Sequence, residues 1–496
     1  MMRFFSSFFS RTNCGFFFIL FTSFVFQNEV FAKEIVVDLD GISTPCDAMR
    51  KGFEEYWKMN DADAFGGHSL TIRGSAKLDF SDFLDMGSYK LCAGLGYHLF
   101  DEGYKLDESF EKVKLSGPIF FDNAVFLYDE KTQDKPVVIF QLGSFYNHGW
   151  YNEGKINRAG GINVGRAIEG NLSIFFTGRR DGGWVRGDVP MMPFAKNSTS
   201  PATTIAWFET GVNRIDMTRL SLTVEAQEKD SDNIGLIHQH SWGVRRGPIR
   251  IENLGVGMLF YGNSVGTVSN SYIHRNDYGI LLGDFEIGGD VAPSPNCLLR
   301  NSDEAGNARS CERRNLSVFG LSIRDTVIEG NAYGNVVIND ASRVEFNSVH
   351  MEMADEQHQK GHGILIGGGR CSSPGVSAVC ADDGDCAKGT CKFPEETVSH
   401  NIRFFGGLIG GDNYSNQWDG VVLGGNAKQR NGVEPSVFIE SLIQNSDLDP
   451  AAQPINSCRA PGVSCELISC RSGANLIVDL SRAFYDDKAS NTSFCN

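Results

Sequence analysis

The sequence contains no block of basic residues, and acidic residues outnumber basic ones. Its 496 residues include 45 Lys and Arg against 61 Asp and Glu, a formal net charge of −16 at neutral pH. Proteins that bind nucleic acid obtain much of their affinity from clustered cations that neutralise phosphates. The composition therefore argues against nucleic acid as a partner.

The sequence also lacks an apolar run long enough to cross a membrane as a helix. The run from Gly15 to Phe26 has about 12 residues, whereas a spanning helix needs about 20. It follows the basic residues Arg3 and Arg11 and precedes Val30-Phe31-Ala32, which suits cleavage after Ala32. We therefore expect residues 1–32 to be a signal peptide, with no membrane span after cleavage. The mature protein is expected to be secreted, periplasmic or on the cell surface.

Proline is scarce, with 15 residues, whereas glycine is abundant, with 56. After Asn60 almost no stretch shows a capped apolar period of 3.6 residues, which excludes a fold of alternating strands and helices. Five segments instead share one pattern, in which a glycine precedes a short apolar run that ends in Gly or Asn. These segments are Gly257–Gly262, Gly279–Gly283, Gly334–Asn339, Gly363–Gly367 and Gly420–Gly424.

Each of these runs is preceded by a second strand-like segment in which apolar and polar residues alternate, as in Pro248–Asn253 and Asn401–Phe405. Two stretches, 285–314 and 370–397, are insertions that carry their own cysteines. With the insertions set aside, short strands recur every 20 to 30 residues or so, with Asn and Gly at the corners. This pattern predicts a solenoid, because Asn and Gly tolerate the left-handed corner conformations.

From about Asn213 to Leu480 this repeat resembles the right-handed parallel β-helix proteins of the pectate-lyase-like superfamily. The resemblance implies an all-β fold, a right-handed parallel β-helix solenoid with disulfide-rich loop insertions and with the repeat glycines stacked along one edge. Residues 33–212 are expected to form an N-terminal cap and irregular first coils, with a separate β-domain as the alternative. Residues 481–496 are expected to be a C-terminal tail.

Residues Cys46–Trp57 are the exception to the scarcity of helices. Met49, Phe53, Tyr56 and Trp57 recur at helical spacing along this segment. Because the open end of a solenoid would expose strand edges and apolar side chains, we expect this helix to cap the first coil.

The cysteines are consistent with an oxidising compartment. Of 13 cysteines, only Cys14 lies in the predicted signal peptide, and an even number in a secreted chain indicates disulfides. We expect pairing within four clusters, most securely between Cys297 and Cys311, although spacing does not choose the connectivity of a four-cysteine cluster. Zinc is an alternative in the third cluster, which lacks a CxxC pair. The clusters are Cys46 and Cys92; Cys297 and Cys311; Cys371, Cys380, Cys386 and Cys391; and Cys458, Cys465, Cys470 and Cys495.

The residues that precede the repeat glycines form the candidate site. If the glycines stack, Tyr278, Tyr333, His362 and Asp419 form one exposed column. His362 and Asp419 are the candidate catalytic residues, with the histidine as acid or base and the carboxylate orienting it. The aromatic rings would stack on sugars, while ordinary polar corner residues are the alternative. The candidate substrate-binding residues are Tyr278, Tyr333, Trp418 and Asp277.

Gly361-His362-Gly363 also looks like the Gly-His-Gly segment of polygalacturonase-type glycoside hydrolases. The paired-Asp and Asn-Thr-Asp segments of that family are missing from the preceding coils, and so is its downstream Arg-Ile-Lys element. Inverting hydrolysis needs two carboxyl groups across the scissile bond. Only His362 is therefore carried over from this resemblance.

Two further groups of residues could bind ligands. His238 and His240, with Trp242, Arg245 and Arg246 beyond them, would suit a metal or an anionic sugar, or form a solvated face. The acidic run 382–385 could hold Ca²⁺ through oxygen ligands, with a solvated loop tip as the alternative. No metal-ligating residue is assigned.

Two functions of different classes remain open at this stage. The first is a secreted β-helix protein that binds, and could cleave, an acidic or neutral polysaccharide as a hydrolase or lyase. The second is a non-catalytic surface or adhesion protein. The fold and the aromatic column favour the first function, whereas no motif supplies a reaction.

Overall fold

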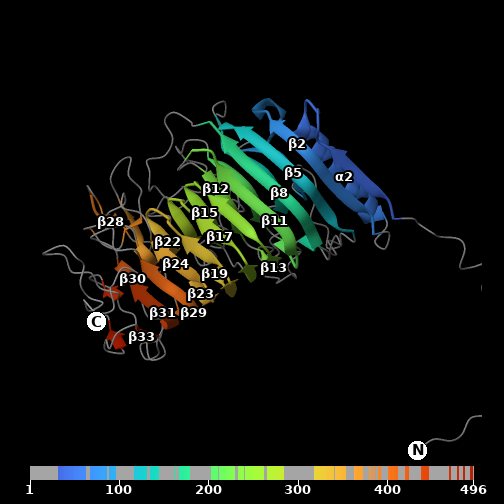
Figure 1. Cartoon of the computed structure of the whole chain (residues 1–496). Coiled ribbons are helices and arrows are strands. Elements are labelled where there is room, and N and C mark those ends of the chain that lie inside the picture. Colours follow the sequence, from blue (N-terminus) through green and yellow to red (C-terminus); the bar gives the residue numbers. More distant parts are fainter. Residues whose placement is uncertain are drawn as a thin grey trace, which may run out of the picture.

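Strands of the chain stack side by side along an elongated body, with a long helix, α2, at its N-terminal end (Figure 1). The computed structural model describes residues 32–494 with internal gaps, of which the longest are 97–116, 144–161, 179–202, 284–317, 424–436 and 446–467. The predicted signal peptide up to residue 31 and the insertion 285–314 lie outside the described residues. Among the helices described, none has the length and apolar character that a membrane span requires.

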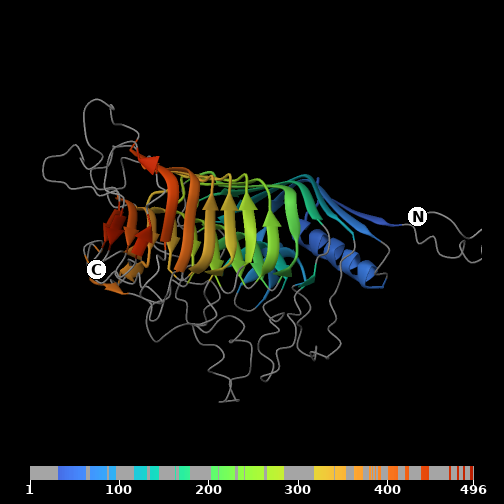
Figure 2. The ribbon, with the colours of Figure 1, turned by 90° about the horizontal axis from the view of Figure 1, so that it is seen from below.

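Two large sheets form the body, and their strands pair in parallel apart from the antiparallel pairs β33–β35 and β3–β4 among those described. The 21-stranded sheet, sheet A, comprises β1 (Glu34–Asp38), β2 (Ser69–Leu78), β5 (Ile119–Asp129), β7 (Ile162–Asn163), β8 (Ala167–Thr177), β10 (Val212–Asn213), β11 (Asp216–Ala226), β13 (Trp242–Arg246), β14 (Ile249–Glu252), β16 (Val265–Ser269), β17 (Tyr272–His274), β19 (Val318–Phe319), β20 (Leu321–Arg324), β21 (Val327–Glu329), β23 (Ala341–Asn347), β24 (His350–Met353), β29 (His400–Gly411), β31 (Val437–Asn445), β33 (Ile477–Asp479), β34 (Phe484–Tyr485) and β35 (Thr492–Phe494). The 11-stranded sheet, sheet B, comprises β3 (Leu84–Asp85), β4 (Lys90–Leu95), β6 (Val137–Gly143), β9 (Thr204–Thr210), β12 (Asn233–Gln239), β15 (Val256–Tyr261), β18 (Tyr278–Leu282), β22 (Gly334–Ile338), β25 (His362–Ile366), β30 (Asp419–Leu423) and β32 (Ile468–Cys470). The chain alternates between the two sheets, and Figure 2 shows their strands as successive rungs. The predicted fold class, an all-β right-handed parallel β-helix with an N-terminal helix, is confirmed.

The lumen between the sheets is the hydrophobic core. Strands of sheet A alternate buried and exposed residues along much of their length, as a sheet with one solvated face should. Strands β6, β9, β12, β18 and β22 of sheet B are buried on both faces. In β9, Trp207 belongs to the luminal core, whereas Ile205 and Phe208 belong to a second apolar layer outside the sheet. Aromatic rings stack along the lumen, with Phe140 and Trp207 centroids 4.4 Å apart.

Corners of the coils use the residues that the sequence indicates. Asn253 and Asn270 adopt left-handed backbone conformations, with φ of 62° and 53°. A buried hydrogen bond links successive coils, because the Asn276 amide donates to Asn331 Oδ1 at 3.0 Å. Within the second of these coils, the Asn331 amide donates to Asn335 Oδ1 at 2.9 Å. These bonds satisfy polar groups that burial would otherwise penalise.

The predicted column of repeat glycines is wrong at one position. Gly334 pairs with Tyr278 and His362, so it lies one residue out of step with Gly279 and Gly363. The register is set by luminal apolar residues such as Ile280, which pairs with Val336. A one-residue shift to match the glycines would turn these side chains out of the core.

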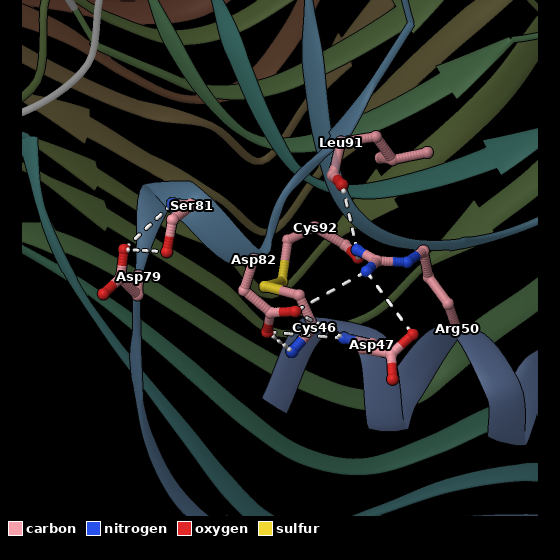
Figure 3. The surroundings of a disulfide bond; sticks show 8 residues. All are labelled: Cys46, Asp47, Arg50, Asp79, Ser81, Asp82, Leu91 and Cys92. Atoms are coloured by element: carbon pink, nitrogen blue, oxygen red, sulfur yellow. Dashed lines mark hydrogen bonds and ion pairs between the residues drawn. A yellow bond between two sulfur atoms is a disulfide. The ribbon is translucent and has the colours of Figure 1, made fainter. Parts of the chain in front are cut away.

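Helix α2 (Pro45–Ala62) covers the first coils, as predicted, and buries Met49, Phe53, Tyr56 and Trp57. Proline suits the first helical position because it lacks the N–H that would be unpaired there. Carboxylate oxygens of Asp82, in the short helix η1 (Phe80–Asp82), accept from the backbone N–H groups of Cys46 at 2.7 Å and Asp47 at 3.3 Å (Figure 3). Burial raises the pKa of Asp82 in spite of these bonds.

The predicted Cys46–Cys92 disulfide is present beside this contact and joins the start of the helix to β4 (Figure 3). Arg50 completes the link by donating to the backbone oxygen of Cys92 at 2.8 Å. The cap is therefore held by a covalent bond as well as by apolar packing.

The stacked coils extend beyond the limits that we predict for them. Parallel pairing begins with β1 and β2, and β8 pairs with β11 across residue 213. Where they are described, residues 33–212 stack as parallel coils whose inward apolar residues continue the same luminal core. The pairings of β2 with β5 and of β5 with β8 each contain a register shift. In the predicted tail, β34 pairs in parallel with β31, and β35 lies antiparallel to β33.

The insertion 370–397 contains a small antiparallel sheet of β26 (Gly369–Cys371), β27 (Val379–Cys380) and β28 (Cys391–Lys392). Its four cysteines form the disulfides Cys371–Cys386 and Cys380–Cys391, which confirms pairing within this cluster. Their sulfurs are therefore not zinc ligands. The Cys297–Cys311 pair and the side chains of the last cluster lie outside the described residues.

Candidate functional site

His362 and Asp419, the predicted catalytic residues, begin β25 and β30 and pair directly with one another in sheet B. The prediction that they lie on successive coils is therefore confirmed for the backbone. Their side chains, and the whole of Trp418, lie outside the described part of the structure.

The rest of the predicted column is not an open groove. Tyr278 and Asp277 are both fully buried, and only Tyr333 is partly exposed. The rings of the two tyrosines do pack together, with centroids 5.9 Å apart. However, the backbone N–H of Val379 donates to the Tyr278 hydroxyl at 3.0 Å, so the insertion covers that ring. Exposure was expected because strand alternation suggests a solvated outer face, whereas the outer face of sheet B is apolar and covered.

An open pocket of about 510 Å³ lies instead on the outer side of sheet A. It is lined by residues of β8, β11 and β13 and of the segment before β11, and Figure 1 shows where these three strands lie in the sheet. Three arginines, Arg214, Arg219 and Arg245, line it. Two carboxylates, Glu169 and Asp216, line it as well. Its other lining residues are Ala167, Ile215, Thr218 and Gly243.

Cross-strand register places these charges together. Arg245 is opposite Asp216 and pairs with it at 3.0 Å, and Arg219 is opposite Glu169 and pairs with it at 3.3 Å. Both arginine side chains remain mostly exposed, at 64% and 75%, and Arg214 is exposed too. The pocket thus presents more guanidinium than carboxylate to solvent.

Local irregularities of the strands accompany this pocket. The pairing of β11 with β8 shifts register between Asp216 and Arg219, and that of β13 with β16 shifts between Trp242 and Val244. Gly243 adopts φ of 67°, which a side chain would strain. Such bulges re-aim side chains and are common beside binding sites. Trp242, next to Gly243, is left 39% exposed at this position.

Asp216 is held ionised in the pocket. Partial burial would raise its pKa, but hydrogen bonds from the hydroxyl and N–H of Thr218 and the charges of Arg245 and Arg219 together lower it. An ionised Asp216 fixes Arg245 in place and leaves the exposed part of that guanidinium for a ligand.

Beneath the pocket, the next residue on β13 points into the lumen. Arg246 is 1% exposed and pairs with the buried carboxylate of Glu209, which His238 also contacts through Nδ1 at 2.8 Å. Burial raises the pKa of Glu209, but the Arg246 charge and the His238 contact outweigh it and bring the pKa to about 2. Burial and the Arg246 charge lower the pKa of His238 to about 4.

The predicted His238–His240 face is therefore not a solvated one at His238, which is completely buried, and His240 lies outside the described residues. Of that group, only Arg245 lines the surface pocket, and Trp242 is the exposed neighbour of the lining residue Gly243. Arg214, Arg219, Asp216 and Glu169 were missed because they come from other coils, and a single sequence carries no spacing signal for cross-coil neighbours.

For the acidic run 382–385, the structure describes Asp383 alone, whose carboxylate accepts from the backbone N–H of Cys391 at 2.7 Å. This bond closes the disulfide-linked insertion. The other residues of the predicted calcium site, Asp382, Gly384 and Asp385, lie outside the described residues.

Comparison with known proteins shows similarity of fold only. No family model and no curated protein matches the sequence. Among solved structures, the chain is similar to the surface protein and adhesin PfbA of Streptococcus pneumoniae, with 10% identity and a TM-score of 0.45 over 90% of this chain and 91% of that one. It is also similar to an iota-carrageenase in complex with iota-carrageenan fragments (9% identity, TM-score 0.40, 94% and 93% covered). The A-module of the mannuronan C-5 epimerase AlgE4 of Azotobacter vinelandii is a third such structure (10%, 0.31, 82% and 92%).

Proposed function

We propose that this is a secreted β-helix protein that binds an acidic polysaccharide at the pocket between β8, β11 and β13. The observation that carries the proposal is the convergence of three exposed arginines in this pocket, whose lining residue Gly243 follows the exposed Trp242 in sequence. Guanidinium groups bind carboxylates and sulfates through paired, charge-assisted hydrogen bonds, and an indole ring can stack on a sugar face. The disulfides suit a protein outside the cytosol.

The overall charge supports a local rather than a diffuse interaction. A chain with a net charge of −16 repels polyanions in general, so an acidic glycan would be held only where cations gather. We expect affinity to fall steeply with added salt, because the Debye length shrinks to about 10 Å at 0.1 M.

Titration calorimetry with size-defined oligouronates, sulfated galactan fragments and neutral dextran fragments tests this proposal. We expect binding of at least one acidic series and none of the neutral one. Arg245→Gln and Trp242→Ala should each weaken binding about tenfold or more, the order of a lost charge-assisted hydrogen bond or ring contact. Arg324→Gln is the matched control, since Arg324 is an exposed arginine of sheet A outside the pocket.

Binding of neutral and acidic sugars alike, or equal losses in Arg245→Gln and Arg324→Gln, would contradict the proposal. Thermal melting of each variant shows whether a loss of binding reflects a loss of folding instead.

Cleavage is a separate proposal that depends on His362 and Asp419. Their direct pairing on successive coils supports it, since a histidine next to a carboxylate can transfer protons. Measuring new reducing ends and unsaturated products with the same substrates tests it. A surface or adhesion protein would bind these substrates without forming either product.

A further inference from the structure

A second group of ionisable side chains lies on the outer side of sheet A, on later coils than the arginine pocket. Register places one column of residues on β14, β17, β21 and β24, and a second column two residues earlier on the same strands. The first column is Glu252, His274, Glu329 and Glu352, and the second is Arg250, Tyr272, Val327 and His350. The residues between the columns, Ile251, Ile273, Ile328 and Met351, are buried in the lumen, so both columns face outward.

Three of these side chains converge. One donor atom from each of Glu329, His350 and Glu352 lies within 4.8 Å of the other two. His350 Nε2 is 3.0 Å from Glu352 Oε2 and 3.9 Å from Glu329 Oε2. Two ligands bound at about 2.1 Å from one metal ion would be separated by about 3.0–3.4 Å. The His350–Glu352 distance already falls in this range, and the His350–Glu329 distance exceeds it by about 0.5 Å.

The Glu329 carboxylate is already oriented for such a role. The Tyr272 hydroxyl donates to Glu329 Oε1 at 2.7 Å, which leaves Oε2 on the His350 side. Partners that orient a ligating carboxylate in this way are a regular part of metal sites. The three side chains are 24–38% exposed, so an ion could enter and keep further positions for water.

From this geometry we propose that Glu329, His350 and Glu352 bind a divalent transition metal ion of the zinc or manganese type. One imidazole nitrogen and two carboxylate oxygens suit these ions, whereas calcium prefers six to eight oxygen ligands. A dication also offsets the repulsion between two carboxylates that share a site. The site bridges β21 and β24 on successive coils, and it does not depend on the carbohydrate proposal.

A hydrogen-bonded network without metal is the competing explanation, because His350 could simply bridge two carboxylates. Calorimetry on the full mature chain, stripped of metal with a chelator and titrated with Zn²⁺ or with Mn²⁺, separates the two. We expect one strong site per chain, weakened at least about tenfold in His350→Ala, Glu352→Gln and Glu329→Gln.

Glu252→Gln is the matched control: it removes one negative charge from the same column, but from a residue paired with Arg250 at 2.7 Å and outside the converging trio. It should leave the affinity within about twofold, since a screened distant charge contributes little. Melting curves in chelator confirm that each variant folds.

Cu²⁺ electron paramagnetic resonance then identifies the nitrogen ligand. Nitrogen hyperfine coupling should vanish in His350→Ala and persist in His274→Ala, because His274 lies outside the trio. The absence of a strong site, equal weakening by Glu352→Gln and Glu252→Gln, or coupling that survives in His350→Ala would overturn the proposal.

Discussion

Glu209 contacts three other buried side chains in the lumen, those of Trp207, His238 and Arg246. Replacing Glu209 tests how much this cluster contributes to the stability of the fold. The Glu209 carboxylate accepts from the Trp207 indole at 2.8 Å and from Arg246, and contacts His238 at 2.8 Å. All four side chains are at most 1% exposed. In Glu209→Gln the Arg246 guanidinium would remain buried without its counter-charge.

The expected cost follows from that unpaired charge. Removing one partner of a buried ion pair typically destabilises a protein by about 3–5 kcal/mol. The entropy of unfolding is about 2.1 cal/mol/K per residue, which gives about 1 kcal/mol/K for a chain of 496 residues that unfolds as one unit. The melting temperature of Glu209→Gln should therefore fall by about 3–5 °C.

Urea unfolding followed by tryptophan fluorescence suits this test, because Trp207 donates directly to Glu209. Glu169→Gln is the control: its ion pair with Arg219 is exposed and should contribute at most about 1 kcal/mol. The double variant Glu209→Gln/Arg246→Met should be more stable than Glu209→Gln alone, because no unpaired charge is left. Our reasoning fails if the two single Glu→Gln variants lose the same stability, or if the second substitution destabilises the protein further.

Three other perturbations have defined outcomes. The pKa of His238 is lowered from 6.5 to about 4, so between these pH values the unfolded chain binds a proton at His238 that the folded chain does not. The free energy of unfolding should therefore fall as the pH drops from 6.5 toward 4. In His238→Asn the urea midpoint should fall less steeply over the same pH range. Replacing Cys46 and Cys92 by serine opens a link with a sequence separation of 46 and should cost about 4 kcal/mol in a chain-entropy model; an unchanged urea midpoint would contradict this. In Gly279→Ala the new Cβ would lie 2.5 Å from the backbone oxygen of Asn335 and should cost about 1–3 kcal/mol, whereas a stability equal to that of the parent protein would show that the coils can move apart there.

The fold could be predicted because a solenoid repeats its signals locally. Apolar runs after Gly257, Gly279 and Gly363 mark strands of sheet B, and each coil needs only its neighbours to bury them. The signal for the capping helix was also local, since its four apolar residues at helical spacing lie within one short segment. The coils before residue 213 show no clear repeat in the sequence because their strands lack the repeat glycine, although these strands alternate buried and exposed residues in the same way.

The candidate site could be predicted only in part, because it depends on register between coils. The predicted register of His362 with Asp419 is correct, because each residue stands at the same distance in sequence from the apolar run that follows it. The predicted column set Tyr333 beside Tyr278 in register, whereas Gly334 pairs with Tyr278 in the structure. The burial of Tyr278 depends on Val379, which belongs to an insertion 101 residues away in sequence. No periodic pattern encodes which insertion covers which strand.

The clearest limit on sequence-based assignment is the pair Arg245 and Arg246. The two are identical in type and adjacent on β13, yet one is 64% exposed in the pocket and the other is 1% exposed in the lumen. Alternation along a strand requires opposite directions, but it does not say which arginine points inward. Glu209 and His238, on neighbouring strands of sheet B, decide it, because they provide Arg246 with a counter-charge and polar contacts inside the lumen. A buried ionic group thus fixes the register of β13, and that register is what turns Arg245 toward solvent and into the pocket.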